Sequence, residues 1–190
     1  MDGSERFVAK GSDLPYSVLD FWRWAYSDLR INTQRGALAE YIVSTSLGES
    51  GQTERSVWDA YDLKSPSGVK IEVKASSYVQ AWEQTKPSQI RFDIAPHRSW
   101  TPQNGYEPVA KRHADVYVFC LFTGTRAEDS LLQLDLWKFY VLPTSTLNER
   151  LPQQKVILLS ALKRLMPVET DYHGLRDAID AAAGVASTEV

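Results

Sequence analysis

The stretch WDAYDLKSPSGVKIEVKASSYVQAW, residues 58–82, decides the fold that the sequence predicts. Its middle, Ser65-Pro66-Ser67-Gly68, is typical of a turn, because proline presets φ and glycine tolerates positive φ. We therefore predict a β-hairpin with arms over residues 56–64 and 69–75. Side chains alternate between the two faces of a strand, so the second arm has one apolar face and one charged face. The charged face carries Lys70, Glu72 and Lys74.

This charged face indicates metal chemistry. Asp62 on the first arm lies across the hairpin from Glu72, so two carboxylates converge. Such carboxylates repel each other unless a cation lies between them. Hard oxygen ligands suit Mg²⁺ or Mn²⁺, and a neighbouring lysine, here Lys74, orients or deprotonates an attacking water. The alternative is a solvated amphipathic strand with cross-strand charge pairs, and the triplet alone fits both interpretations.

A helix is predicted over about residues 32–47, where apolar residues recur at helical spacing and Gly48 follows. Glu40 lies near the edge of the apolar stripe of this helix. It is either an exposed glutamate or a further acid that points toward the hairpin. Arg35, one turn earlier, is predicted to be solvated rather than to contact a phosphate. Gln80, six residues after Lys74, is a surface amide or a polar group that faces the site.

Asp62 together with Glu72-Val73-Lys74 resembles the catalytic core of the PD-(D/E)xK nuclease superfamily, which has the restriction-endonuclease-like fold. The hairpin and its flanks are most similar to bacterial Mrr-like and related restriction-type nucleases. Tyr61 stands where the motif has proline, the least constant part of the pattern. The resemblance is strong only over residues 35–82.

The resemblance implies roles for individual residues. Asp62, Glu72 and the backbone carbonyl of Val73 would bind Mg²⁺ or Mn²⁺, and Lys74 would position the hydrolytic water. Glu40 would extend the metal shell, and Gln80 would face the metal site or the DNA backbone. Asp59, the rival acid, faces the opposite side of the strand from Asp62 and is expected to make a structural contact.

A function follows from these roles as an expectation. The chain would be a metal-dependent endonuclease that hydrolyses phosphodiester bonds of DNA. Its expected substrate is double-stranded DNA, and its expected role is restriction, defence or DNA processing. A homodimer would supply the two active sites that many double-strand cutters need. The alternative is a catalytically inactive nucleic-acid-binding or assembly protein that keeps the nuclease fold.

The order of the remaining elements favours an α/β fold with three layers, in which helices flank a mixed central sheet. We expect one domain over residues 1–190, with residues 1–13 and 184–190 flexible. The predicted elements are a helix over 15–29, strands over 89–95, 114–122 and 136–142, a long loop over 96–112, a helix or turn over 145–151, a strand-to-helix segment over 155–165, and a helix over 171–183. The run at 114–122 is the most apolar and is predicted to be a central buried strand.

Composition excludes several classes of function. The 190 residues carry a net charge of −3, one cysteine and three scattered histidines, which argues against a zinc cluster. The sequence has no nucleotide-binding or GxSxG motif. No apolar run approaches the roughly 18 residues of a membrane span, and the N-terminus lacks the apolar region of a secretory signal. We therefore expect a cytoplasmic protein in which Cys120 is a buried thiol.

Overall fold

The computed structural model describes residues 1–48, 59–101, 103, 105–126 and 128–185. A five-stranded mixed sheet forms its centre, in the order β11-β9-β8-β4-β3. These strands are β3 (Leu63–Lys64), β4 (Lys70–Ser77), β8 (Val116–Phe122), β9 (Trp137–Pro143) and β11 (Val168–Thr170). β4 and β8 run parallel, and every other neighbouring pair in this sheet is antiparallel. The predicted mixed central sheet is confirmed.

Strand β8 is the central strand of this sheet, as its apolar sequence predicted. All seven of its residues are buried. A strand covered on both faces excludes water from both sets of side chains, so it contains an unbroken apolar run instead of an alternating one. β8 pairs with β4 on one side and β9 on the other over its whole length.

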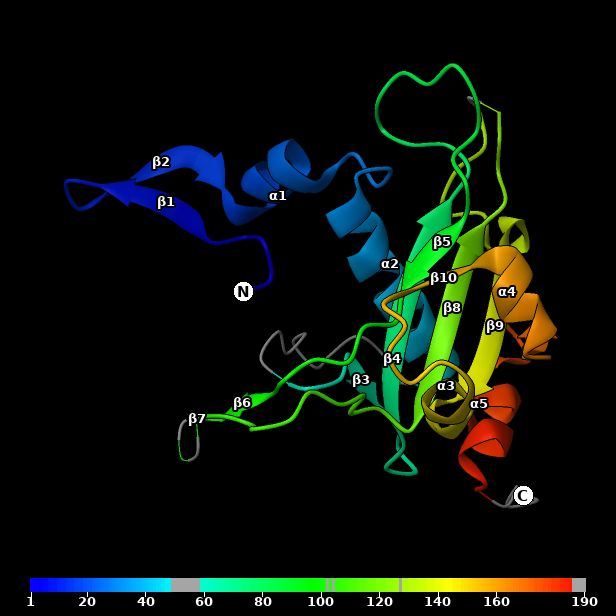
Figure 1. The fold of residues 1–190 in the computed structure, drawn as a ribbon. Helices are drawn as coiled ribbons and strands as arrows, with labels where there is room; N and C mark the ends of the chain where they lie inside the picture. Colours follow the sequence, from blue (N-terminus) through cyan, green and yellow to red (C-terminus); the bar gives the residue numbers. More distant parts are fainter. Residues whose placement is uncertain (49–58, 102, 104, 127, 186–190) are drawn as a thin grey trace.

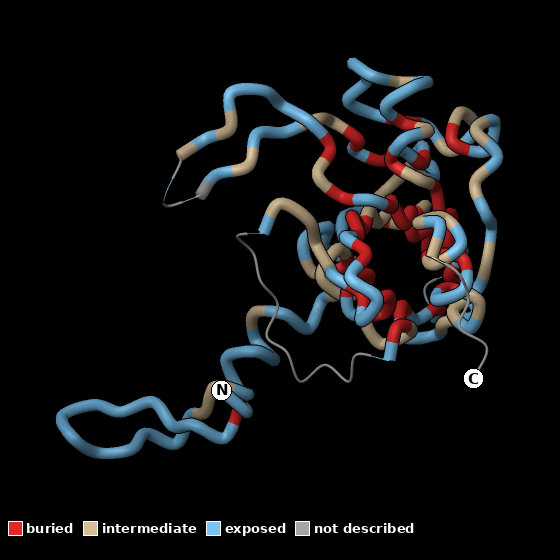
Figure 2. The backbone as a smooth tube through the Cα atoms, turned by 90° about the horizontal axis from the view of Figure 1, so that it is seen from below, coloured by how far each residue is buried: buried red, intermediate tan, exposed pale blue. Residues whose placement is uncertain are grey.

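Two packed layers cover the two faces of the sheet (Figure 1). Helices α2 (Asn32–Ser46) and α5 (Leu175–Ala183) cover the face that carries Val73 and Val118. The other face carries Tyr117 and Phe119 and is covered by helices α3 (Thr144–Arg150) and α4 (Leu159–Arg164) and by the strand pair β5 (Arg91–Asp93) and β10 (Val156–Leu158). Figure 2 shows the buried residues gathered around the sheet. The chain is therefore a layered α/β protein.

The β3–β4 hairpin has the predicted turn but a shorter first arm. Leu63 pairs with Ile71, and Gly68 has a φ of 89° in the turn, where a side chain would be strained. The Ser65 hydroxyl accepts a hydrogen bond from the Val69 amide at 3.0 Å. β3 has only two residues. Asp62, directly before it, still donates its backbone amide to the Ile71 carbonyl, and its side chain accepts the Val73 amide of β4. Residues 56–58 of the predicted arm lie outside the described residues.

The first 26 residues form an arm that the sequence did not predict. Strands β1 (Arg6–Ala9) and β2 (Ser12–Ser17) pair as a hairpin that extends from the segment expected to be flexible, residues 1–13, into the start of the helix predicted over 15–29. Lys10 and Gly11 both have positive φ, as tight hairpin turns require. Helix α1 (Val18–Tyr26) begins three residues later than predicted, because Ser17 and Asp20 form a capping box at its start.

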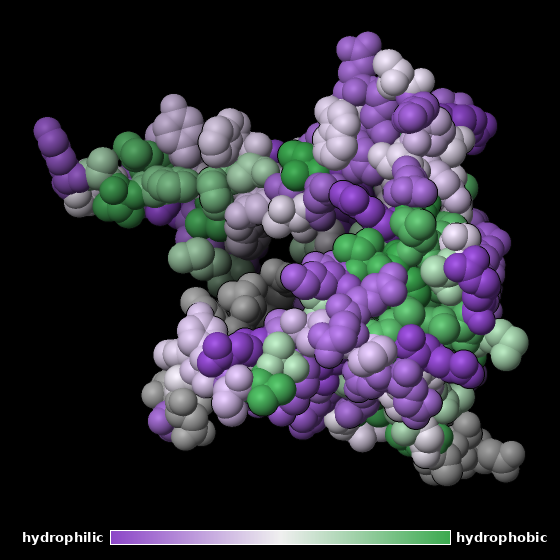
Figure 3. All heavy atoms as spheres, in the orientation of Figure 1, coloured by the Kyte–Doolittle hydropathy of each residue, from purple (hydrophilic) through white to green (hydrophobic). Residues whose placement is uncertain are grey.

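This arm projects away from the sheet (Figure 1) and is almost entirely exposed (Figure 2). Helix α1 buries none of its residues. Trp22 and Trp24 both lie on this arm, and Trp24 is 85% exposed. Figure 3 shows hydrophobic side chains gathered along the arm.

Other elements differ from the prediction in their pairing. The predicted strand over 89–95 exists as β5 but pairs with β10 in a separate two-stranded sheet. The predicted long loop contains a short hairpin, β6 (Trp100–Thr101) and β7 (Gly105–Tyr106). Strand β11 and the short 3₁₀ helix η1 (Leu134–Leu136) were not predicted. In the part of the chain that the structure describes, no helix has the length and apolarity to span a membrane.

Leu121→Ala tests the packing of β8. Leu121 is 2% exposed, so its truncation removes buried surface and leaves a cavity. We expect the free energy of unfolding to fall by about 2–5 kcal/mol, measured by urea denaturation. The matched control is Leu132→Ala, because Leu132 is 68% exposed, and its effect should stay within about 0.5 kcal/mol. Equal losses in the two variants would contradict the described burial of β8.

Candidate active site

Glu72 and Lys74 lie on the same face of β4, two residues apart. The Lys74 ammonium donates to Glu72 Oε1 at 2.6 Å. Glu72 is only 7% exposed. Its backbone position pairs with Tyr117 of β8, which holds the pair against the layer formed by β5 and β10. The structure thus brings together the two charged residues of the predicted ExK motif in a half-buried ion pair.

Asp62 directly precedes β3 and lies at the edge of β4. Its amide donates to the Ile71 carbonyl at 3.0 Å, and its Oδ2 accepts the Val73 amide at 2.7 Å. The amide and carbonyl of one strand residue point to the same side of the strand. The Val73 carbonyl is therefore directed toward the edge that Asp62 occupies, which places it beside that carboxylate.

Charges around Lys74 favour its protonated form. Burial alone would lower the pKa of the Lys74 ammonium, but the Glu72 carboxylate, with Asp62 and Asp93, raises it above its ordinary value. A lysine with a raised folded-state pKa stabilises the fold below its ordinary value of 10.5, and this stability is lost as the pH rises through the folded-state pKa. Lys74 is therefore a cation throughout the neutral range.

Glu40 lies in α2, which covers the opposite face of β4 from Glu72 and Lys74. It is 8% exposed, not on the surface of the helix. Burial raises the pKa of the Cys120 thiol, and the charges of Asp62 and Glu40 act in the same direction. Asp62 and Glu40 therefore both lie within electrostatic reach of one buried sulfur beneath the sheet.

Gln80 belongs to a different network from Lys74. Its Oε1 accepts from Arg35 Nη1 at 3.3 Å, and its side-chain amide donates to the Ser77 carbonyl at 2.8 Å. Gln80 and Arg35 line a pocket of about 330 Å³ at the end of β4. The prediction that Arg35 is solvated is wrong: it is 4% exposed, because α2 packs directly against β4.

The residues at the edge of β4 offer a divalent ion only a few protein ligands. Among the described residues, no group of three His, Cys, Asp or Glu side chains forms a cage for a metal. Mg²⁺ rarely needs such a cage, because it keeps several waters and is bound through one or two carboxylates together with substrate phosphates. The carboxylates of Asp62 and Glu72 and the carbonyl of Val73 are a donor set of that kind.

The chain matches a known protein family over most of its length. The family model described as bacteriophage T4 endonuclease IV matches residues 5–133, well over half of the chain. The chain belongs to this family. No curated protein matches the sequence. The endonuclease IV match includes the N-terminal arm, all of β4 and every predicted site residue, whereas β9 and the elements after it lie beyond it.

Asp93 near the site was not predicted from the sequence, and Arg35 was named but predicted to be solvated. Asp93 of β5 contributes to the electrostatic environment of Lys74 and Tyr117. Its position on the polar face of the alternating segment QIRFDIA was a usable signal. Arg35 gave no such signal, because a single arginine on a helix is exposed in most proteins. Only the packing of α2 against β4 reveals that it is buried.

The raised pKa of Lys74 can be tested by titrating lysine Cε carbons in NMR spectra. We expect Lys74 to titrate above the ordinary value of 10.5. In Glu72→Gln the largest favourable charge is lost while the burial remains, so its pKa should fall. A wild-type Lys74 that titrates below 10.5, or one unaffected by Glu72→Gln, would contradict the ion pair.

Proposed function

We propose that the chain is a DNA endonuclease that uses a divalent metal ion, with Asp62, Glu72 and Lys74 as its catalytic residues. One observation carries the proposal: Asp62 accepts the amide of Val73, the residue between the paired Glu72 and Lys74, within the part of the chain that matches an endonuclease family. The finer assignment, a PD-(D/E)xK site acting on double-stranded DNA in restriction or DNA processing, rests on the resemblance of the motif.

Asp62, Glu72 and the Val73 carbonyl would hold Mg²⁺ or Mn²⁺, with Glu40 approaching from the α2 side. A bound ion of this kind polarises the scissile phosphate and lowers the pKa of a bound water. Glu72 also holds the Lys74 ammonium in place through the 2.6 Å contact. Gln80 contributes to the substrate side of the site through its contact with Arg35.

The protonation state of Lys74 assigns its role. A general base must be neutral before it can accept a proton, and the charges around Lys74 oppose that state. We therefore assign Lys74 to the stabilisation of negative charge that develops on the phosphate, and not to removal of a proton from water. The cleavage rate should therefore show no transition near neutral pH that depends on deprotonation of Lys74.

A second function has a specific observation in its favour. The Glu72–Lys74 ion pair satisfies both charges without a metal, and the described residues provide no three-ligand cluster. The same residues would then serve a catalytically inactive DNA-binding or assembly protein. Titration with Mn²⁺, followed by paramagnetic broadening of NMR signals near β4, separates the two functions, because only the nuclease has a saturable site.

Plasmid cleavage in Mg²⁺ or Mn²⁺ tests the proposed function. The wild-type protein should nick or cut DNA, and chelation with EDTA should abolish this activity. Asp62→Ala and Lys74→Ala should lower the cleavage rate by at least about 10²-fold, the loss typical when a group that stabilises the transition state is removed.

The controls are Asp59→Ala and Lys155→Ala, which remove one exposed acid and one exposed base outside the proposed site. They should cleave at the wild-type rate. Wild-type activity in both Asp62→Ala and Lys74→Ala would reject the assignment, as would cleavage that persists in EDTA.

The exposed N-terminal arm supports a homodimer as the active form. A lone two-stranded hairpin is at best marginally stable in water, and this arm adds a helix with no buried residue. Large apolar side chains are at least one-third exposed all along it. These are Phe7, Val8, Leu14, Tyr16, Leu19, Phe21, Trp22, Trp24 and Tyr26.

Area and charge both favour a second copy of the chain as the partner of the arm. The exposed apolar surface of these side chains is on the order of 800 Å², about the area that each partner buries in a standard interface. Residues 1–26 carry four acidic and three basic residues, so the arm lacks the positive charge expected of a DNA-binding surface. Reciprocal exchange of identical arms is a low-cost route to a symmetric dimer.

Light scattering coupled to gel filtration tests the dimer. The wild-type protein should have twice the chain mass of 21.5 kDa. Trp24→Asp and Phe21→Asp place charges in the proposed interface and should yield monomers. Leu132→Asp, at a residue outside the arm whose exposed fraction of 68% lies between those of Phe21 and Trp24, should remain dimeric. A monomeric wild-type protein, or arm variants that stay dimeric and lose DNA binding, would overturn this assignment.

A further inference from the structure

The pocket at the end of β4 has a distinctive set of walls. It has a volume of about 330 Å³, and none of the described residues that line it is acidic. Its polar lining includes Asn32, Arg35, Ser76, Gln80 and Arg91. Two guanidinium groups therefore face one pocket in a chain whose net charge is −3. Such a local concentration of positive charge attracts anions.

Arg35 is a buried cation whose hydrogen bonds are incomplete. Its Nη1 donates to the Arg30 carbonyl at 2.9 Å and its Nη2 to Asn32 Oδ1 at 2.6 Å, but its buried Nε has no partner. No carboxylate of a described residue lies within ion-pair distance of it. Burial lowers the pKa of Arg35, as it also lowers that of Arg112, so the hydrogen bonds and not the pKa distinguish these two arginines.

The second buried arginine shows what a purely structural role requires. Arg112 is also almost fully buried. Its Nε donates to Ile94 O, its Nη1 to Asn148 Oδ1, and its Nη2 to the carbonyls of Leu151 and Gln154. All three of its nitrogens thus have protein acceptors, whereas the Nε of Arg35 has none. A buried donor without an acceptor loses solvation and gains nothing in return unless a ligand supplies the acceptor.

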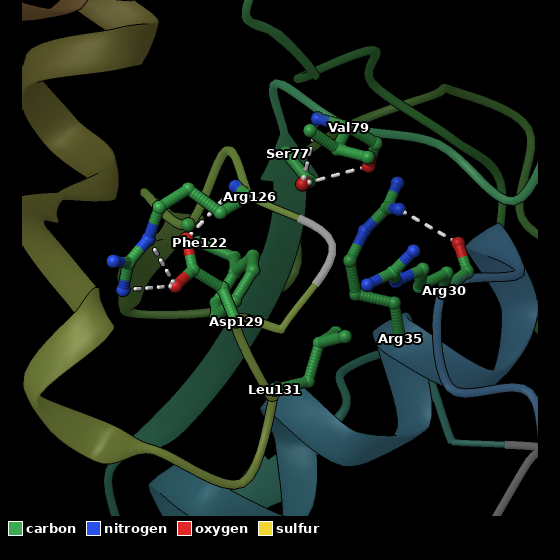
Figure 4. Close-up of a pocket in the computed structure, with 9 residues that line it drawn as sticks. Arg30, Arg35, Ser77, Val79, Phe122, Arg126, Asp129 and Leu131 are labelled. Atoms are coloured by element: carbon green, nitrogen blue, oxygen red, sulfur yellow. Dashed lines mark hydrogen bonds and ion pairs between the residues drawn. The ribbon is translucent and has the colours of Figure 1, made fainter.

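Arg35 lines the pocket of about 330 Å³. It also lines a second pocket, shared with Arg30, whose volume of about 10 Å³ has room for one water at most (Figure 4). In that smaller pocket the Arg126 guanidinium is paired with Asp129. The larger pocket is therefore where a ligand of any size can meet Arg35.

The start of α2 contributes to the same pocket. Asn32 is both the first residue of α2 and part of the pocket wall, and no side chain of a described residue caps this helix end. The backbone amides at the start of a 15-residue helix carry a partial positive charge that favours anions. This adds to the charges of Arg35 and Arg91.

We propose that this pocket binds a backbone phosphate of the DNA next to the phosphate that is cut, with Arg35 and Arg91 as its main contacts. Ser76 of the pocket wall lies two residues beyond Lys74, about 7 Å along the strand. That distance is close to the length of one nucleotide step. The pocket therefore fixes the register of the DNA on the cleavage site, and the inference rests on the proposed function.

Fluorescence anisotropy with short labelled DNA in EDTA tests the subsite without cleavage. Arg91→Gln should weaken binding about tenfold, because it removes one charge-assisted contact. It should also reduce the slope of log affinity against log salt by about one, the effect of losing one neutralised phosphate. Arg35→Gln should act in the same way, and its thermal melting shows whether it folds. Arg91 is exposed, so its variant remains informative if Arg35→Gln is unstable.

The control is Arg150→Gln, which removes an exposed arginine at the end of α3 that lines neither pocket. It should keep wild-type affinity and salt slope. Wild-type binding by Arg91→Gln and folded Arg35→Gln, or an equal loss in Arg150→Gln, would overturn the subsite even if the protein cleaves DNA. Specific loss of binding in a protein that never cleaves DNA would support the subsite and reject the nuclease function.

Discussion

The parallel pairing of β4 with β8 is the constraint on which the rest of the structure depends. β8 is buried on both faces and pairs with β4 from Ile71 to Ser77. A one-residue slip of this register would exchange the two faces of β4, placing Glu72 and Lys74 in the α2 layer and Val73 in the polar cluster. The apolar side chains on both faces of β8 make that exchange costly. The fixed register therefore presents the acid and the lysine side by side.

The edge of β4 away from β8 is the second consequence of this pairing. Among the described residues, β3 covers only the start of that edge, and Asp62 reaches the Val73 amide from the side. The Asp62 charge consequently influences Lys74 on one face of the sheet and Cys120 on the other. Acids that approach from opposite faces, such as Glu72 and Glu40, can meet only at such an edge. This is the physical reason why the proposed site lies where the hairpin ends.

The two buried arginines, Arg112 and Arg35, differ in how completely their guanidinium groups are hydrogen-bonded. Arg112 ties β5, α3 and the loop after it together through carbonyl acceptors, and its network is complete. Arg35 occupies a comparable depth with an incomplete network beside an open pocket. The exposed N-terminal arm is a larger unsatisfied surface, because its apolar side chains have no partner within the described part of the chain. These two unsatisfied surfaces among the described residues are the basis of the proposed dimer and the proposed phosphate subsite.

The sequence alone determined the features that depend on local patterns. The apolar run of β8, the turn at Ser65–Gly68, the alternation of Glu72 and Lys74, and the terminal helix all follow from periodicity and turn chemistry. The sequence also predicted that Asp62 lies near Glu72, and the structure joins Asp62 to the neighbouring residue, Val73, through the Val73 amide. Only the tertiary structure decided that Arg35 is buried, that Gln80 joins it, that β5 pairs with β10, and that residues 1–26 project as an arm. These features depend on contacts between segments far apart in the chain, and a local pattern carries no information about which distant surface will cover it.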